Sequence, residues 1–172
     1  MRPFKALVTF KFTLASLMVF VLGLGFASSS LVTAWASIRI SRARACQANL
    51  KSLWQAQFDF AARETNPCCG PMRTQVGADF WLKLQRARRP IVDSYDRFFC
   101  PLAGERTVEG RTSYRGPRLN VNKMDDEDAV GADKEGNHGR GERGHVLKKT
   151  GEIIEASGNG PAWSLAQATT RE

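Results

Sequence analysis

The hydrophobic positions of this chain are unevenly distributed, and the longest apolar run lies near the N-terminus. Residues 12–38 include no charged side chain, and a helix needs about 20 apolar residues to cross the hydrocarbon core of a bilayer. Arg2, Lys5 and Lys11 precede the run. The pattern predicts a basic cytoplasmic leader over 1–11 and a single transmembrane helix over 12–38, with Trp35 near a membrane interface.

Two other interpretations compete with the anchor. The sequence Ala34-Trp35-Ala36 has the small-x-small form of a signal-peptidase site, which would release a soluble exported protein. Alternatively, the run is a buried helix of a soluble protein. We favour the anchor because the run exceeds the apolar region of about 7–15 residues in a signal peptide. Basic residues flank both ends, so the positive-inside rule does not decide the orientation.

The order of the segments suggests an orientation where the flanking charges do not. A short N-terminal arm followed by a larger domain is the usual arrangement of an export signal. We therefore expect a protein of the cell inner membrane that crosses the bilayer once. Its C-terminal domain, residues 39–155, is expected to be extracytoplasmic.

A helical pattern continues beyond the apolar run. One apolar stripe recurs at spacings of three and four residues and comprises Cys46, Leu50, Leu53, Trp54, Phe58 and Ala61. The polar residues between them, Gln57 among these, are assigned to the solvent side. We predict one continuous helix to about Arg63, ended by Asn66-Pro67.

The rest of the domain is predicted to contain a second helix and several short strands. Asp79 begins a helical pattern that continues to Ala87 and is ended by Pro90. Strands are predicted at 97–100, 112–114, 145–147 and 153–154, the last two joined by a hairpin turn over 148–151. Residues 156–172 are predicted to be a flexible tail. The expected fold class is therefore α+β.

The formal net charge of +8 suggests nucleic acid as a partner, but the placement of the charges favours lipid. Six basic and no acidic residues occur in 1–44, beside the apolar run, where basic groups meet anionic headgroups. A second basic cluster consists of Lys83, Arg86, Arg88 and Arg89. We interpret this cluster as a solvated helix face and do not expect nucleic acid to bind.

The four cysteines favour a disulfide over a metal site. They are Cys46, Cys68, Cys69 and Cys100. Outside the cytoplasm a disulfide is expected, and neighbouring Cys68 and Cys69 seldom pair with each other, so we predict that one of them bonds Cys100. No C-x-x-C spacing is present, and the sequence therefore predicts no zinc site.

Several short segments carry a resemblance to a known protein family. Lys11-Phe12-Thr13-Leu14 resembles the Gly-Phe-Thr-Leu-Ile-Glu processing motif of type IV pilins and type II secretion pseudopilins, and 46–56 resembles the amphipathic part of the pilin helix. Phe99-Cys100-Pro101, 112–117, Gly136-Asn137-His138-Gly139, 146–147 and a turn at Gly151 follow in the order seen in pseudopilin-like proteins. The resemblance implies a long helix packed on a small antiparallel β-sheet. It also implies a structural subunit of a secretion or pilus-like assembly, with membrane lipid and other pilin-like subunits as partners.

The chain departs from this family at the positions that govern processing. In the family a peptidase cuts between the Gly and the Phe, which correspond to Lys11 and Phe12, and a Glu neutralises the new amine. Lys11 replaces that Gly, Ser16 replaces that Glu, and Thr150 replaces the Asp of the hairpin. These departures weaken the case for leader cleavage and for ordinary filament packing. The alternatives are a monomeric, membrane-anchored extracytoplasmic binding module and a DNA-uptake pilin.

An acidic segment after residue 123 is the candidate cofactor site. Asp125, Asp126, Asp128 and Asp133 offer the carboxylate oxygens that calcium prefers, although their spacing is not that of an EF-hand. Major pseudopilins are similar in using an acidic C-terminal loop for calcium. A solvated acidic loop without a metal is the competing interpretation.

Two histidines offer a further arrangement, in which His138, His145 and Asp133 form the triad of a metal hydrolase. No other feature supports catalysis, because the chain has no H-E-x-x-H, no G-x-S-x-G and no glycine-rich phosphate loop after a strand. The sequence therefore predicts a protein that is not an enzyme.

Overall fold

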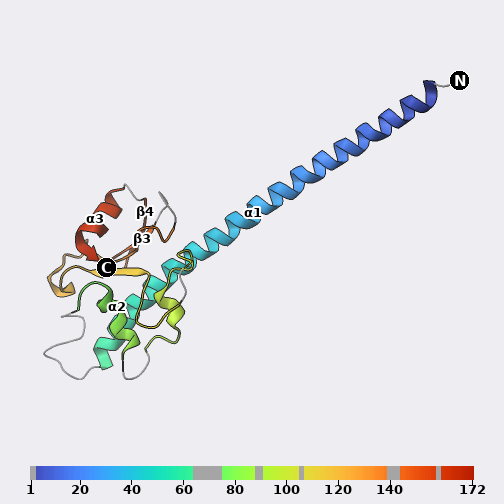
Figure 1. The fold of residues 1–172 in the computed structure, drawn as a ribbon. Helices are drawn as coiled ribbons and strands as arrows, with labels where there is room; N and C mark the ends of the chain where they lie inside the picture. Colours follow the sequence, from blue (N-terminus) through green and yellow to red (C-terminus); the bar gives the residue numbers. More distant parts are fainter. Residues whose placement is uncertain (1–2, 64–74, 88–90, 105–106, 139–143, 158–159) are drawn as a thin grey trace. The chain divides into compact units, whose positions relative to one another are not determined.

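The structure, a computed structural model, describes residues 3–63, 75–87, 91–104, 107–138, 144–157 and 160–172, with the α1 side chains of 16–21 and 30–62. The chain divides into two compact units, Met1–Ile40 and Ser41–Glu172. The elements are helix α1 (Pro3–Arg63), helix α2 (Ala78–Gln85), 3-10 helix η1 (Tyr95–Phe98), strand β1 (Tyr114–Pro117), 3-10 helix η2 (Val121–Lys123), and strands β2 (Ala129–Asp133), β3 (Gly144–Lys148) and β4 (Ile153–Ala156), followed by helix α3 (Pro161–Thr169) and strand β5 (Thr170–Arg171) (Figure 1).

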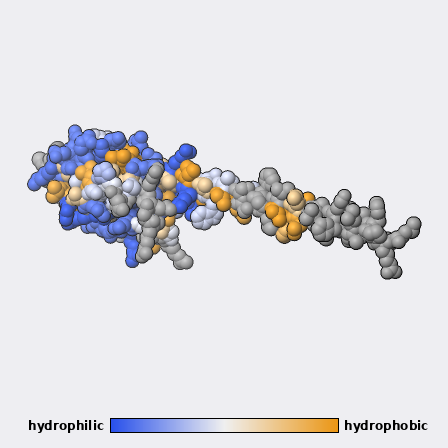
Figure 2. Space-filling model, turned by 90° about the horizontal axis from the view of Figure 1, so that it is seen from above, coloured by the Kyte–Doolittle hydropathy of each residue, from blue (hydrophilic) through white to orange (hydrophobic). Residues whose placement is uncertain are grey.

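The first unit consists of helix α1 up to Ile40. Its described apolar side chains are exposed, for example Phe20 at 65% and Leu31 at 68%, and Figure 2 shows hydrophobic residues on the visible surface of this part of the helix. Within the part of the chain that the structure describes, no helix is both long and apolar enough to traverse a membrane. The side chains of 22–29, in the middle of the predicted span, lie outside that part.

The second part of α1 confirms the predicted helix and most of its apolar stripe. The helix ends at Arg63, and Cys46, Leu50 and Leu53 are fully buried. Beyond Trp54 the assignment of Phe58 to the apolar stripe and of Gln57 to the solvent side was wrong, because Gln57 is fully buried whereas Phe58 is 53% exposed. Steps of three and four residues from Leu50 lead through 53 and 57, so position 58 falls on the flank of the stripe.

The sheet confirms the predicted α+β class. It has five strands in the order β4-β3-β2-β1-β5, and all of its pairs are antiparallel. The predicted hairpin joins β3 to β4, and its turn contains Gly151 at φ 87°, a left-handed conformation that favours glycine. One irregularity interrupts the β2–β3 pairing between Ala129 and Gly131.

Helices cover both faces of the sheet within the 41–172 unit. On one face, the buried part of α1 and helix α2 pack on Tyr114, Val130 and Leu147. On the other, Trp163 of α3 packs over residues such as Val146. Two strand glycines permit close packing, since a Cβ on Gly131 would lie 2.7 Å from the Trp81 ring and one on Gly144 would lie 2.9 Å from the Trp163 ring.

Three local predictions were wrong. Residues 97–100 were predicted as a strand, but 95–98 form a 3-10 helix, with the Ser94 hydroxyl accepting a hydrogen bond from the Asp96 amide. The segment 156–172 is not a loose tail, because it contains α3 and β5. The acidic segment contains β2, all five residues of which are buried. The second helix was predicted correctly, with Asp79 in its first turn.

Candidate metal centre

The register of three neighbouring strands aligns polar side chains across one face of the sheet. Tyr114 of β1 pairs with Asp133 of β2, and Ala132 pairs with Val146 of β3, which sets Asp133 beside His145. The His145 amide donates to Asp133 Oδ2 at 2.8 Å, and His145 Nδ1 lies 3.1 Å from the same oxygen. All three side chains are buried. The antiparallel register therefore gathers residues that are far apart in the sequence.

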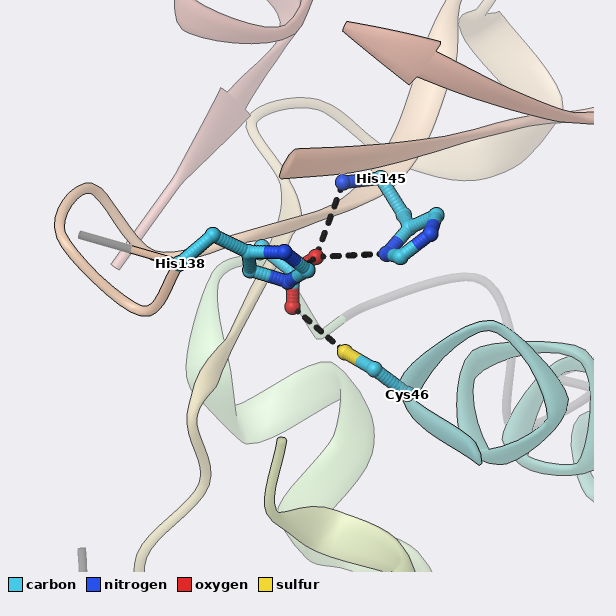
Figure 3. Close-up of side chains that lie close together, drawn as sticks. Cys46, His138 and His145 are labelled. Carbon is cyan, nitrogen blue, oxygen red and sulfur yellow. Dashed lines mark hydrogen bonds and ion pairs between the residues drawn. The ribbon is translucent and has the colours of Figure 1, made fainter. Parts of the chain in front are cut away.

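Two further side chains complete the cluster (Figure 3). Cys46 reaches it from α1 and donates a hydrogen bond from Sγ to Asp133 Oδ1 at 2.9 Å. His138 comes from the turn after β2, and its Nε2 lies 2.9 Å from Asp133 Oδ2. That turn is held in place by Asn137, whose amide donates to the Ser113 carbonyl at 2.8 Å. Asp133 is thus the common partner of one thiol and two imidazoles.

Cys100 and Tyr114 lie beside this group. Cys100 Sγ is 3.4 Å from His138 Nε2, and the Tyr114 hydroxyl is 3.6 Å from Cys46 Sγ. Cys100 and Tyr114 are 2% and 0% exposed. Both side chains are therefore buried next to the cluster.

The electrostatics of the cluster centre on Asp133. Burial by itself would raise the pKa of Asp133, but hydrogen bonds from His138 and His145 outweigh it and hold this pKa well below its usual range. Burial opposes protonation of His138, yet the hydrogen bonds to Asp133 and Cys100 raise its pKa to about 9. Asp133 and His138 thus form a buried ion pair.

The two thiols differ in acidity. Burial, followed by the hydrogen bond with Cys100 and the charge of Asp133, raises the pKa of Cys46 far above its ordinary value. The hydrogen bond with Cys46 is the largest influence on Cys100 and lowers its pKa to about 6, with a further contribution from His138. Without a bound cation, the Cys46 thiol stays protonated and donates to Asp133.

The arrangement differs from a nucleophilic triad. In a triad, the two imidazole nitrogens face different partners, one the nucleophile and the other the carboxylate. Here the same nitrogen, His138 Nε2, faces both Cys100 and Asp133. Cys100 is also buried and does not line the surface pocket of about 440 Å³ between α2 and 108–112. The geometry instead places one thiol, one carboxylate and two imidazole donors within 4.8 Å of one another, a donor set that suits a metal ion.

The structure separates the four residues of the predicted calcium loop. Asp133 points into the buried cluster, whereas Asp126 forms an ion pair with Lys149 at 3.2 Å and Asp128 accepts the Asp125 amide at 2.9 Å. Among the described residues, Asp125, Asp126 and Asp128 form no metal-binding group with Asp133. The assignment of Asp133 to a calcium loop was therefore wrong, because β2 carries its side chain to the sheet face that meets α1.

The other sequence-predicted residues lie apart from the cluster. Cys100 is a free thiol here, and Cys68 and Cys69 lie outside the described residues. Lys11 and Phe12 belong to α1, but their side chains lie outside the described part.

The second basic cluster is not one solvated face. Lys83 is 5% exposed, with its ammonium 4.6 Å from the centre of the Phe80 ring. Arg86 is exposed and pairs with Asp79 at 3.4 Å, while Arg88 and Arg89 lie outside the described residues. The interpretation of Lys83 as solvated was wrong, since its stem packs into the core and its charge lies over aromatic rings.

Sequence reasoning grouped Asp133, His138 and His145 but missed Cys46. Spacing rules for zinc sites depend on ligands that are close in sequence, and Cys46 lies 87 residues before Asp133. The available signal was the position of Cys46 at the start of the apolar stripe.

Comparisons of the chain with protein-family models, with curated proteins and with solved structures found no match.

Proposed function

We propose that this chain is a non-enzymatic, membrane-anchored, pseudopilin-like structural subunit of a secretion or pilus-like assembly. Its domain lies outside the cytoplasm, beyond the inner membrane. The observation that carries the proposal is the dual composition of α1. The helix contains the uncharged run of 12–38 and later supplies Cys46, Leu50 and Leu53 to the core of an antiparallel sheet domain.

The polar residues within the apolar run support a lipid environment for this part of α1. The Thr33 hydroxyl donates to the Ser30 carbonyl at 3.0 Å, and the Ser37 hydroxyl donates to the Thr33 carbonyl at 2.9 Å. Such bonds satisfy hydroxyl groups without water, which a helix in hydrocarbon requires. Large apolar side chains such as Phe20, Leu31 and Trp35 are exposed and need a covering of lipid or of neighbouring helices.

The first experiment tests the anchor. Full-length protein carrying Phe20→Arg and Leu31→Arg should leave the membrane pellet for the supernatant, because each arginine at the centre of a membrane helix costs about 2.5–3.5 kcal/mol. Leu119→Arg is the matched control, since Leu119 is an exposed leucine of the domain at 57%. A C-terminal alkaline phosphatase fusion reports the orientation. Wild-type protein that stays soluble after high-speed sedimentation would refute the anchor.

A second experiment tests the assembly. A photo-crosslinking amino acid at Leu17 or Val32, both exposed on α1, should capture other pilin-like subunits in membranes, whereas the same probe at Leu119 should not. Because helices associate in membranes through close packing, only probes on the anchor helix are expected to report contacts with neighbouring subunits. A monomer in detergent that forms no crosslinks would favour a lone anchored module.

One observation favours the alternative of an anchored binding module. The pocket of about 440 Å³ has apolar walls from Leu82 and Phe99 and two cationic residues, Arg111 and Lys134. Such a lining suits a small anionic ligand. The third alternative, a DNA-uptake pilin, receives no support from Lys83, because its ammonium lies over the Phe80 ring.

A further inference from the structure

Four buried side chains from separate parts of the 41–172 unit bring their donor atoms together: Cys46 of α1, Asp133 of β2, His138 of the following turn and His145 of β3. Figure 3 labels Cys46 and the two histidines. These donors all lie within 4.8 Å of one another. In a tetrahedral zinc site, bonds of about 2.0–2.3 Å set the donors about 3.3–3.8 Å apart. We propose that these four side chains bind one structural zinc ion.

The chemistry of the donors selects zinc over calcium and magnesium. Calcium and magnesium take oxygen ligands, six or more in number, whereas this group offers one sulfur, two nitrogens and one carboxylate oxygen. A set of four that mixes thiolate and imidazole matches the tetrahedral preference of zinc. Asp126, whose carboxylate would suit calcium, instead pairs with Lys149 at 3.2 Å.

The charges of the site also balance. Cys46 binds as a thiolate and Asp133 as a carboxylate, so their two negative charges cancel those of Zn²⁺, and both histidines bind as neutral imidazoles. A buried ion needs this compensation, because uncompensated charge is costly in the interior of a protein.

The enclosure of the site points to a structural metal. Each of the four residues is at most 8% exposed, and none of them lines the pocket beside α2. A catalytic zinc keeps one coordination position for water, whereas a structural zinc takes all four ligands from the protein. The ion would join α1 to β2 and β3 directly, and this role does not depend on the function proposed for the whole chain.

Gln57 provides a control on the same helix as Cys46. It is fully buried like Cys46, and its amide donates to the Phe80 carbonyl at 2.6 Å. Among the described residues it does not belong to the group of four donors. Gln57→Ala and Cys46→Ser each remove a buried polar group of α1, but only Cys46→Ser removes a ligand.

The experiment measures metal in the full-length protein, purified in detergent from cells grown with zinc. Elemental analysis should find one zinc ion per wild-type chain and per Gln57→Ala chain. In Cys46→Ser and His145→Gln the affinity for zinc, measured by competition with a chelator, should fall at least about tenfold, since loss of even an outer partner weakens such sites by about 10–100-fold. A chelator should lower the melting temperature of wild-type protein and leave that of Cys46→Ser unchanged.

Cobalt gives a test that needs no variant. Wild-type protein loaded with Co²⁺ should show the visible bands of tetrahedral cobalt together with a sulfur-to-cobalt charge-transfer band. Folded wild-type protein with neither zinc nor these bands would overturn the proposal and leave a hydrogen-bonded cluster without metal. Equal loss of zinc affinity in Gln57→Ala and Cys46→Ser would overturn the assignment of the four ligands.

Discussion

Substitution of Trp163 by alanine should destabilise the 41–172 unit by about 3–5 kcal/mol. Trp163 is 5% exposed and packs on the sheet face opposite α1. A buried tryptophan removes about 150–250 Å² from water, which contributes about 4–6 kcal/mol at about 25 cal/mol per Å². The rest of its cluster is made of alanines and Val146, which are too small to fill the space left by the ring.

The assay is urea unfolding of the full-length chain in detergent, followed by far-ultraviolet circular dichroism. Tryptophan fluorescence is unsuitable because the substitution removes a fluorophore. Gln167→Ala is the control, since Gln167 is exposed on the same helix and its loss should cost less than about 0.5 kcal/mol. If Trp163→Ala unfolds within about 0.5 kcal/mol of wild type, α3 does not pack on the sheet and 156–172 is a loose tail.

Three shorter predictions use the same unfolding assay. Gly116→Ala should cost about 3 kcal/mol, because its Cβ would overlap the backbone carbonyl of Gly77; wild-type stability would show that the two segments do not touch. Gln57→Ala should lower the free energy of unfolding by about 1–3 kcal/mol, since its buried amide donates to the Phe80 carbonyl at 2.6 Å. An equal effect of alanine at the exposed Gln55 would contradict the burial of Gln57. Lys83→Met should lower the free energy of unfolding by about 0.5–2 kcal/mol, because it removes the cation–π contact. An unchanged free energy of unfolding at both low and high salt would contradict that contact.

The long helix and the hairpin were predictable because their signals are local. Apolar positions three and four apart indicated α1 to Arg63, and the glycine of the turn indicated the β3–β4 hairpin. The error at Gln57 has a physical cause. Its burial depends on α2, which covers it and accepts its amide hydrogen bond, and residue polarity alone does not show this.

The C-terminal elements and β2 were missed because their signals depend on tertiary contacts. The sequence of α3 is mostly small residues with one tryptophan, so its helical face is visible only once Gly144 gives Trp163 room to pack. Strand β2, Ala-Val-Gly-Ala-Asp, follows an acidic segment and contains a glycine that is unfavourable in strands, yet the Trp81 ring occupies the space above Gly131. In both cases, a tryptophan ring on a helix packs against a glycine in a strand.

The cluster could be predicted only in part, because its geometry depends on register. His138 and His145 stand near Asp133 in sequence, but the alignment of Asp133 with His145 requires the β2–β3 pairing. The role of Cys46 requires the packing of α1 on that face. A shift of one residue in the strand pairing would turn Asp133 to the face covered by α3.

The position of Cys46 along α1 links the proposed metal to the proposed function. Among the described residues of the 41–172 unit, Cys46 is the first buried residue of the helix, because Ser41, Arg42, Arg44 and Ala45 are exposed and Ala43 is half-buried. Any force that pulls the helix from the domain therefore acts first on the contacts of Cys46. At this position a hydrogen bond to Asp133 alone contributes about 1.5–3 kcal/mol. Zinc coordination would tie the same sulfur to two strands, and breaking a single metal–ligand bond would be costly. A subunit held by its helix in a membrane assembly gains most from a strong link at this first buried position.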